Sequence, residues 1–159
     1  LTAVRTAFDK PVFVSTHPRT RKRLEALPNW SQPEGITFSE PLGFHDYNKL
    51  QLSAACCLSD SGTIAEESTL LGFPAVTLRE SIERPEALDT GGIVMTGLHA
   101  DDVVAAVDLA MSLAPSRGAV GQMTPDDYLV SDTSERTVKF ILSTARRHHQ
   151  WAGIRSAPA

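Results

Sequence analysis

Residues 57–68 read CLSDSGTIAEES, and the rest of the chain is best interpreted from this stretch. The apolar run from Ala54 to Leu58 predicts a buried strand, because it is too short and too unpatterned for a helix. The run breaks at residues 60–62, and an apolar pattern of helical period resumes at Ile64. A strand that turns into a helix in this way directs free backbone N–H groups and the positive end of the helix dipole toward a bound anion, typically a phosphate.

The same residues allow an explanation without a ligand. Thr63 and Glu66 have the spacing of a capping box, in which side chains satisfy the backbone N–H groups at a helix start. The adjacent pair Glu66 and Glu67 also favours the helix dipole. On this stretch alone, an anion site and an ordinary helix cap explain the residues equally well.

The composition is that of one ordinary globular domain. The chain has 159 residues, of which 42% are hydrophobic and 21% charged, enough for a substantial core. A net charge of −4 argues against nucleic-acid binding, and the apolar runs are too short to span a membrane. The opening LTAVR has neither an initiator Met nor a signal-peptide pattern, so we expect a fragment of a longer protein.

The two cysteines and the missing motifs limit the possible chemistry. Cys56 and Cys57 are neighbours in the predicted strand and point to opposite faces, so we expect reduced core thiols in a cytosolic protein. No Cys/His spacing predicts a zinc site. Neither GxxxxGK[ST] nor GxGxxG occurs, so a P-loop nucleotide and a dinucleotide cofactor are unsupported. We therefore expect no metal and no cofactor.

Strands and helices alternate along the chain, which predicts an α/β fold with a Rossmann-like parallel sheet and helices on both faces. Strands are expected at residues 11–16, 36–39, 54–58, 75–78 and 93–96. Helices are expected at residues 18–27, 44–55, 64–71, 101–113 and 132–149, with a further helix around Pro85 that ends at Gly91-Gly92. Residues 114–130 are expected to be mostly loop.

Three of these helices carry predicted apolar stripes that would face the core. In the 44–55 helix the stripe is Phe44, Tyr47 and Leu50 or Leu52. In the 101–113 helix it is Val103, Val104, Val107 and Met111. In the last helix it is Val138, Ile141, Leu142 and Ala145.

Polar clusters follow three of the predicted strands, at residues 17–19, 60–63 and 83–85. Ligands of parallel α/β sheets bind beyond the carboxyl ends of the strands. Each cluster stands after a strand and at the start of a helix, so the three share one edge of the predicted sheet. Their convergence favours a phosphate-bearing ligand over coincidental capping.

Single residues of these clusters keep two interpretations each. Arg19 and Arg84 are either surface residues or phosphate contacts. His17 is either a helix cap or a diphosphate contact that acts in proton transfer. Glu67 either favours the helix dipole or accepts hydrogen bonds from ribose hydroxyls. Tyr47 is either a core residue or a stacking platform for a base.

The motifs together resemble one family. HPRT (17–20), EPL (40–42), DSGTIAEE (60–67) and ERPEA (83–87) resemble the C-terminal half of the non-hydrolysing UDP-N-acetylglucosamine 2-epimerases, in order and spacing from residue 11 to about 100. DYNKLQ (46–51), and Thr63 where the main group usually has a second Gly, resemble the branch that forms UDP-N-acetyl-L-fucosamine. That branch acts on UDP-2-acetamido-2,6-dideoxy-L-talose in capsule or O-antigen synthesis.

The resemblance implies an architecture and a location. It implies a two-domain GT-B fold with the UDP-sugar in the cleft, an enzyme that is cytoplasmic, and a homodimer in full-length form. Residues 1–159 would be the single C-terminal UDP-binding domain, with the N-terminal domain absent. Since the family's acid–base carboxylates reside in that other domain, the chain alone is expected to be inactive.

The resemblance also assigns roles to residues. By position, Ser61, Gly62 and Thr63 would bind the diphosphate, and Glu67 would hold the ribose hydroxyls. Tyr47 would lie by the uracil. His17 would approach the diphosphate as the catalytic residue of this half, and Arg84 would support the phosphate end. Arg19 is a further candidate for binding UDP. The implied reaction eliminates UDP across C1–C2 of the sugar and adds it back with C2 inverted.

Other functions remain open at this point. A GT-B glycosyltransferase donor domain would share the fold and the UDP site, although DSGxxxEE with ERPEA fits the epimerases better. A flavodoxin-like or receiver-type signalling domain needs an acidic cluster after the first strand, where this chain has Thr16-His17-Pro18. A nucleotide-binding module without catalysis is the third alternative.

Overall fold

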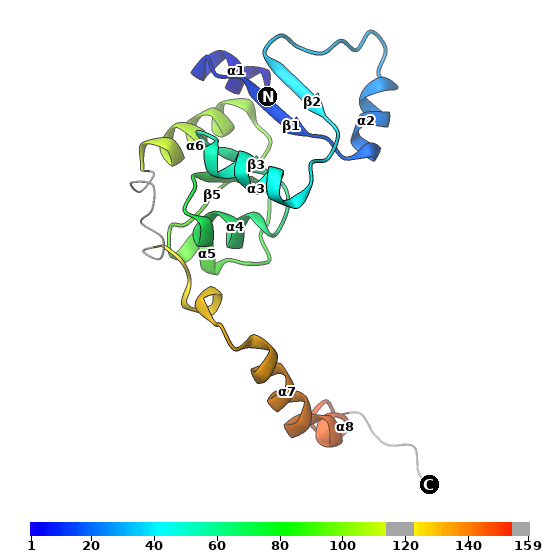
Figure 1. Cartoon of the computed structure of the whole chain (residues 1–159), viewed down its shortest axis with the longest axis vertical. Coiled ribbons are helices and arrows are strands. Elements are labelled where there is room, and N and C mark those ends of the chain that lie inside the picture. The colour runs from blue at the N-terminus through cyan, green and yellow to red at the C-terminus, as the bar shows by residue number, and fades with distance from the viewer. Residues whose placement is uncertain (114–122, 154–159) are drawn as a thin grey trace. The chain divides into compact units, whose positions relative to one another are not determined.

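The computed structural model describes residues 1–113 and 123–153 (Figure 1). They belong to two compact units, Leu1–Pro125 and Asp126–Ala159, which are described separately. In chain order the first unit contains α1 (Thr2–Phe8), β1 (Val12–Ser15), α2 (Pro18–Glu25), β2 (Ile36–Ser39), α3 (Phe44–Ser53), β3 (Cys57–Ser59), α4 (Ile64–Leu71), β4 (Ala75–Leu78), α5 (Glu86–Asp89), β5 (Val94–Thr96) and α6 (Ala100–Ser112). Of the loop expected at residues 114–130, residues 114–122 lie outside the described residues.

The strands of the first unit pair in parallel, which confirms the predicted α/β class. β1 pairs with β2, with Val12 opposite Ile36. The other three strands form a sheet in the order β3-β4-β5. In it, Cys57 lies opposite Ala75. Hydrogen bonding thus divides the strands between two sheets, a separation that the alternation of strands and helices does not reveal.

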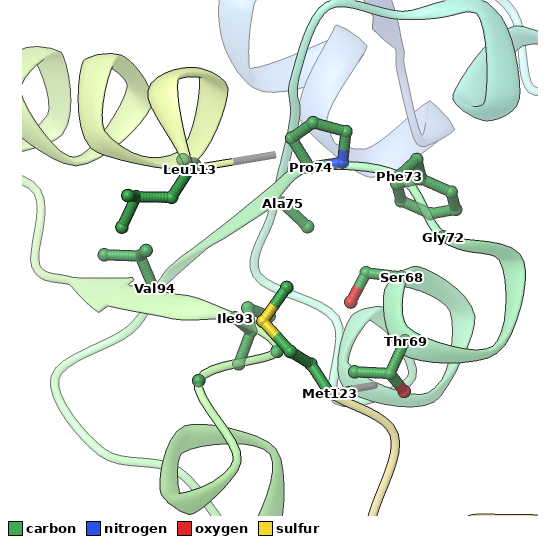
Figure 2. A pocket seen from close by; sticks show the side chains of 13 residues that line it. Ser68, Thr69, Gly72, Phe73, Pro74, Ala75, Ile93, Val94, Leu113 and Met123 are labelled. Atoms are coloured by element: carbon green, nitrogen blue, oxygen red, sulfur yellow. The ribbon is translucent and has the colours of Figure 1, made fainter. Parts of the chain in front are cut away.

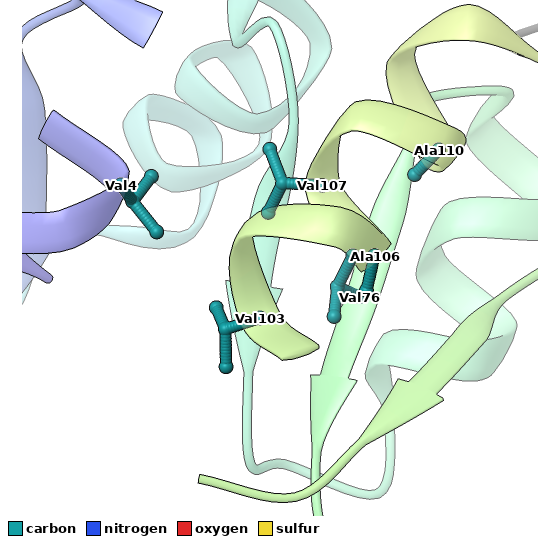
Figure 3. Close-up of a cluster of buried hydrophobic side chains, with 6 residues drawn as sticks. All are labelled: Val4, Val76, Val103, Ala106, Val107 and Ala110. Atoms are coloured by element: carbon teal, nitrogen blue, oxygen red, sulfur yellow. The ribbon is translucent and has the colours of Figure 1, made fainter. Parts of the chain in front are cut away.

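The central strand β4 is buried on both of its faces. Val76 is fully buried, at 0% exposure, and packs in a cluster with one residue of α1 and four of α6, namely Val4, Val103, Ala106, Val107 and Ala110 (Figure 3). Ala75 and Thr77 are also buried, and alternation along a strand turns them to the opposite face. There they share recesses with residues of α4. Helices therefore cover both faces of this sheet.

Most predicted boundaries in this unit are confirmed to within two residues. β2 and β4 begin and end where the apolar runs do, and Gly72 closes α4 with φ 71°. β3 begins later than predicted because the last turn of α3 reaches Ala54, whose N–H donates to the Leu50 carbonyl at 2.9 Å and whose own backbone is extended. The stripe predicted for α6 is confirmed, with Val104 and Met111 partly buried against the cluster. Helix α1 was not predicted.

The stripe predicted for α3 is wrong. Phe44 is 78% exposed, and Leu50 and Leu52 are exposed as well, whereas Gln51 is only 4% exposed. Tyr47, which is half-buried, lies four residues before Gln51. Residues four apart lie on the same side of a helix, so α3 turns a Tyr–Gln face inward rather than a leucine face.

The second unit contains the short 3₁₀ helices η1 (Asp126–Leu129) and η2 (Ala145–Arg147), together with α7 (Thr133–Thr144) and α8 (His148–Trp151). The continuous helix predicted for 132–149 is interrupted at η2. Its predicted stripe is not buried, since Val138, Ile141 and Leu142 are all more than half exposed. A single helix with short turns cannot enclose an apolar face by itself.

No helix in the described part of the chain has the length and apolar character needed to cross a membrane.

Both cysteines are free, as predicted, but they are half-buried rather than in the core. Burial raises the pKa of Cys56 to about 12, with a smaller contribution from its neighbour Cys57. Burial also raises the pKa of Cys57 to about 12, and the negative charge of Glu67 is the second cause. Because the thiolate is the reactive form, both side chains are unreactive at neutral pH.

Truncating the central strand should destabilise the first unit. We expect Val76→Ala to lower the free energy of unfolding by about 2 kcal/mol, because it opens a cavity under α6. Leu98→Ala removes a larger side chain, but Leu98 is 75% exposed, so a loss below about 0.5 kcal/mol is expected. Urea unfolding followed by circular dichroism measures both. Equal losses would contradict burial of Val76 on this face.

The thiols should resist alkylation in the folded chain. With pKa values near 12 rather than the ordinary 9.0, iodoacetamide at pH 8 should react about a thousandfold more slowly than with the unfolded chain. Glu67→Gln removes a negative charge, which lowers the pKa of Cys57 and accelerates its reaction. Cys56, whose pKa owes nothing to Glu67, serves as the internal control. Mass spectrometry measures the alkylation rate of each cysteine. If Glu67→Gln accelerated the alkylation of Cys56 and Cys57 equally, the effect of Glu67 on the pKa of Cys57 would be refuted.

Candidate functional site

The turn between β3 and α4 is braced by its own hydroxyl groups. The Ser61 N–H donates to Ser59 Oγ at 3.1 Å, and the Thr63 N–H donates to Ser61 Oγ at 3.4 Å. Ser61 Oγ and Thr63 Oγ1 are 3.0 Å apart and share a hydrogen bond. Ser61 and Thr63 are exposed. The turn therefore presents hydroxyl groups beside the first N–H groups of α4, which have no partner within a helix.

The capping box is not formed. Thr63 already has helical dihedral angles, φ −75° and ψ −11°, and its side chain makes no capping bond. Its Oγ1 donates instead to Glu67 Oε1 at 2.8 Å. Glu66, the other member of the expected box, is paired with Arg84. The explanation of this stretch by a capping box is thus wrong.

Arg84 lies against the turn. Its Nε is 3.0 Å from Glu66 Oε1, and its Nη1 donates to Glu66 Oε2 at 3.3 Å. This two-point contact fixes the plane of the guanidinium. A Cβ atom on Gly62 would come within 2.9 Å of Arg84 Nη1. Gly62 therefore allows the arginine to approach the backbone at the start of α4.

A second group surrounds Glu67 and joins α3 to α4. Glu67 Oε1 accepts from Thr63, and Glu67 Oε2 accepts from Gln51 Nε2 at 2.7 Å. Burial raises the pKa of Tyr47, and the negative charge of the nearby Glu67 raises it further. Within the described residues no cation pairs with Glu67. Its donors in this part of the chain, Thr63 and Gln51, are both neutral.

His17 and Arg19 are not linked to this group by the contacts of residues 1–113. His17 begins α2, where its Nδ1 accepts from the Arg19 N–H at 3.1 Å, so its capping role is confirmed. Arg19 is exposed. No hydrogen bond or ion pair in residues 1–113 joins either side chain to the turn or to Arg84. The structure therefore brings together Tyr47, the turn, Glu67 and Arg84, and leaves His17 and Arg19 on the other sheet.

Of the three helix starts expected to converge, the one at residues 83–85 does not supply a helix N-terminus to the site. The cluster at residues 83–85 precedes α5, which has only four residues. Arg84 contributes a side chain to the site rather than a helix N-terminus. Of the predicted helix starts, that of α4 is the one surrounded by other candidate residues.

Sequence reasoning missed Gln51. Its signal was the four-residue spacing from Tyr47, which places both on one helix face. Gln51 Oε1 is buried without a hydrogen-bond partner among the described residues, as is Thr77 Oγ1. Thr77 lines a small recess behind the turn together with Gly62 and Arg84.

The described residues include no group of three His, Cys, Asp or Glu side chains placed to hold a metal ion.

A separate cavity of about 110 Å³ lies at the opposite ends of the strands. Ala75 and Val94, the first residues of β4 and β5, line it, and Figure 2 shows Met123 and Leu113 beside them. Its lining is mainly apolar. It therefore does not belong to the polar group at the carboxyl ends of the strands.

Comparison with known proteins places these features in a family. The model of the UDP-N-acetylglucosamine 2-epimerase family matches residues 1–142. A UDP-N-acetylglucosamine 2-epimerase from Methanocaldococcus jannaschii is 32% identical over 108 residues, covering 66% of this chain and 30% of the relative.

Two solved structures of similar proteins share the fold. The structure of UDP-N-acetylglucosamine 2-epimerase from Rickettsia bellii matches with a TM-score of 0.81 and 34% identity, over 97% of this chain and 42% of that one. The M. jannaschii epimerase in complex with UDP-GlcNAc and UDP matches with a TM-score of 0.68 and 26% identity, over 89% and 38%. The chain thus spans less than half the length of these relatives. It belongs to the UDP-N-acetylglucosamine 2-epimerase family.

Proposed function

We propose that this chain is the C-terminal, UDP-binding domain of a two-domain GT-B epimerase that inverts C2 of a UDP-2-acetamido sugar. The observation that carries the proposal is the arrangement at the start of α4: a hydroxyl-lined turn, Arg84 against Gly62, and Glu67 one turn further along. Relatives with bound UDP-GlcNAc support the nucleotide as the ligand. The N-terminal domain of the enzyme is not in this chain.

In the proposal, the turn receives the diphosphate. Ser61 and Thr63 offer hydroxyl donors, and the first N–H groups of α4 add the positive end of the helix dipole. Arg84 is already paired with Glu66, so it contributes a braced guanidinium rather than an unpaired charge. This arrangement stabilises the negative charge that grows on UDP as its bond to the sugar breaks.

The other end of the nucleotide meets a carboxylate and an aromatic ring. Glu67 accepts hydrogen bonds from the ribose hydroxyls, because a carboxylate oxygen can accept more than one donor. Tyr47 lies on the neighbouring helix, half-buried beside Glu67, and its ring stands by the uracil. A nucleoside diphosphate suits this division into an anion-binding end and a hydroxyl-binding end.

The reaction eliminates UDP across C1–C2 and adds it back with C2 inverted. His17 approaches the diphosphate from the start of α2, with Arg19 beside it at the phosphate end. The His17 Nδ1 accepts from the backbone, so a neutral ring carries its proton on Nε2, from which it can donate to the departing phosphate. The acid–base carboxylates belong to the N-terminal domain.

The substrate within the family is UDP-2-acetamido-2,6-dideoxy-L-talose, and the product UDP-N-acetyl-L-fucosamine serves capsule or O-antigen synthesis. The DYNKLQ segment and Thr63 support this branch. Both features meet at Glu67, since Gln51 of that segment and Thr63 are its two donors. The full-length enzyme is a homodimer.

UDP should bind to the 159-residue chain through Glu67. We expect Glu67→Gln to weaken UDP binding about tenfold, because an acceptor of two hydroxyl groups is replaced by an amide with one oxygen. The matched control is Glu135→Gln, which removes an exposed carboxylate of α7 that pairs with Lys139. Isothermal titration calorimetry with UDP measures both variants. A wild-type chain that does not bind UDP would refute the nucleotide site.

The chain alone should not epimerise a UDP-sugar. In heavy water, an epimerase incorporates deuterium at C2 without any acceptor substrate, and NMR spectroscopy detects the exchange. We expect no exchange with the 159-residue chain and exchange with a version that carries the N-terminal domain. Turnover by the chain alone would contradict the proposed division of the active site. A longer version that binds UDP without exchange would instead favour a glycosyltransferase donor domain.

A further inference from the structure

We infer that Gln51 is a positioning residue that orients the Glu67 carboxylate toward two neighbouring hydroxyl groups of a nucleotide's ribose. The inference rests on the proposed role of Glu67 in UDP binding. Gln51 itself need not touch the ligand. Its effect comes from the hydrogen bond of 2.7 Å between its Nε2 and Glu67 Oε2, which links α3 to α4.

The orientation of the Gln51 amide is determined by its partner. A carboxylate only accepts hydrogen bonds, so the NH₂ group and not the carbonyl must face Glu67. The other end of the amide, Oε1, is then buried without a partner among the described residues. With 4% exposure, the side chain leaves an acceptor unsatisfied, which normally costs stability. An apolar side chain would avoid this cost, so packing alone does not explain a glutamine here.

The two donors hold the carboxylate at both oxygens. Thr63 binds Oε1 and Gln51 binds Oε2, which prevents the group from rotating. Two ionised carboxylate oxygens offer about four acceptor positions, so about one on each oxygen remains. Two acceptors held in one plane match two adjacent hydroxyl groups. Without Gln51, the carboxylate would be free to turn, and ordering it would oppose binding.

A simpler role would be a tether between α3 and α4. A tether and a positioning bond differ in what their loss affects. Loss of a tether would weaken every ligand of the site, or only the stability of the fold. Loss of the positioning bond would weaken only those ligands that present hydroxyl groups to Glu67.

The experiment compares UDP with 2′,3′-dideoxy-UDP on Gln51→Met and Gln51→Leu, which keep an apolar side chain of suitable size. We expect UDP to bind about tenfold more weakly to both variants, and the dideoxy analogue to bind within twofold of wild type. Asn48→Leu is the matched control on the same helix, because among the described residues that amide donates to the Phe44 carbonyl and not to Glu67. Calorimetry gives the affinities, and thermal unfolding checks that each variant is folded.

A double-mutant cycle with Glu67→Ala shows whether Gln51 acts through Glu67. On the Glu67→Ala background, Gln51→Met should weaken UDP binding no further. Equal losses for UDP and its dideoxy analogue, or a loss that persists without Glu67, would overturn the inference. A wild-type chain that binds both nucleotides equally, or neither, would overturn the role of Glu67 itself. If the wild-type chain binds UDP more tightly than the dideoxy analogue and Gln51→Met keeps this difference, the inference about Gln51 is overturned but the role of Glu67 is not.

Discussion

The first unit depends on β4 being buried on both faces. Val76 packs under α6 on one side, and Ala75 and Thr77 face α4 on the other. With β3 and β5 paired in parallel along its two edges, the strand fixes where α4 starts and where the loop after β4 passes. That loop carries Arg84 to the turn before α4. The candidate site is thus a consequence of how one strand is enclosed.

The backbone elements were largely predictable because their signals are local. The apolar runs of β2 and β4 are bounded by breakers, and Gly72 ends α4 by adopting a left-handed conformation that few other residues tolerate. Helix α1 lacks such a signal. It has seven residues, and only Val4 is buried, so too few apolar positions recur to reveal a helical period. The split into two sheets depends on pairing between distant residues and has no local signature.

The side-chain partners were not predictable, and Glu66 and Glu67 show why. Both were interpreted as acting on the helix dipole, but successive residues of a helix point about 100° apart. Glu66 therefore meets Arg84, eighteen residues later, and Glu67 meets Gln51, sixteen residues earlier. Such partners are set by the packing of α3 and of the loop after β4. The binding and catalytic roles predicted for the residues of the site all stay predictions.

The separation of the two glutamates divides the electrostatics of the site. Glu66 neutralises Arg84 and holds it against the turn, so the proposed diphosphate would rely there on hydroxyl and N–H donors. Glu67 has no cation among the described residues, and its charge raises the pKa of Tyr47 and Cys57. An uncompensated carboxylate attracts neutral hydroxyl donors and repels phosphate oxygens. In the proposed complex, both conditions are satisfied when the ribose lies at Glu67 and the diphosphate lies at the turn, so the charge pattern supports the proposed orientation of the nucleotide.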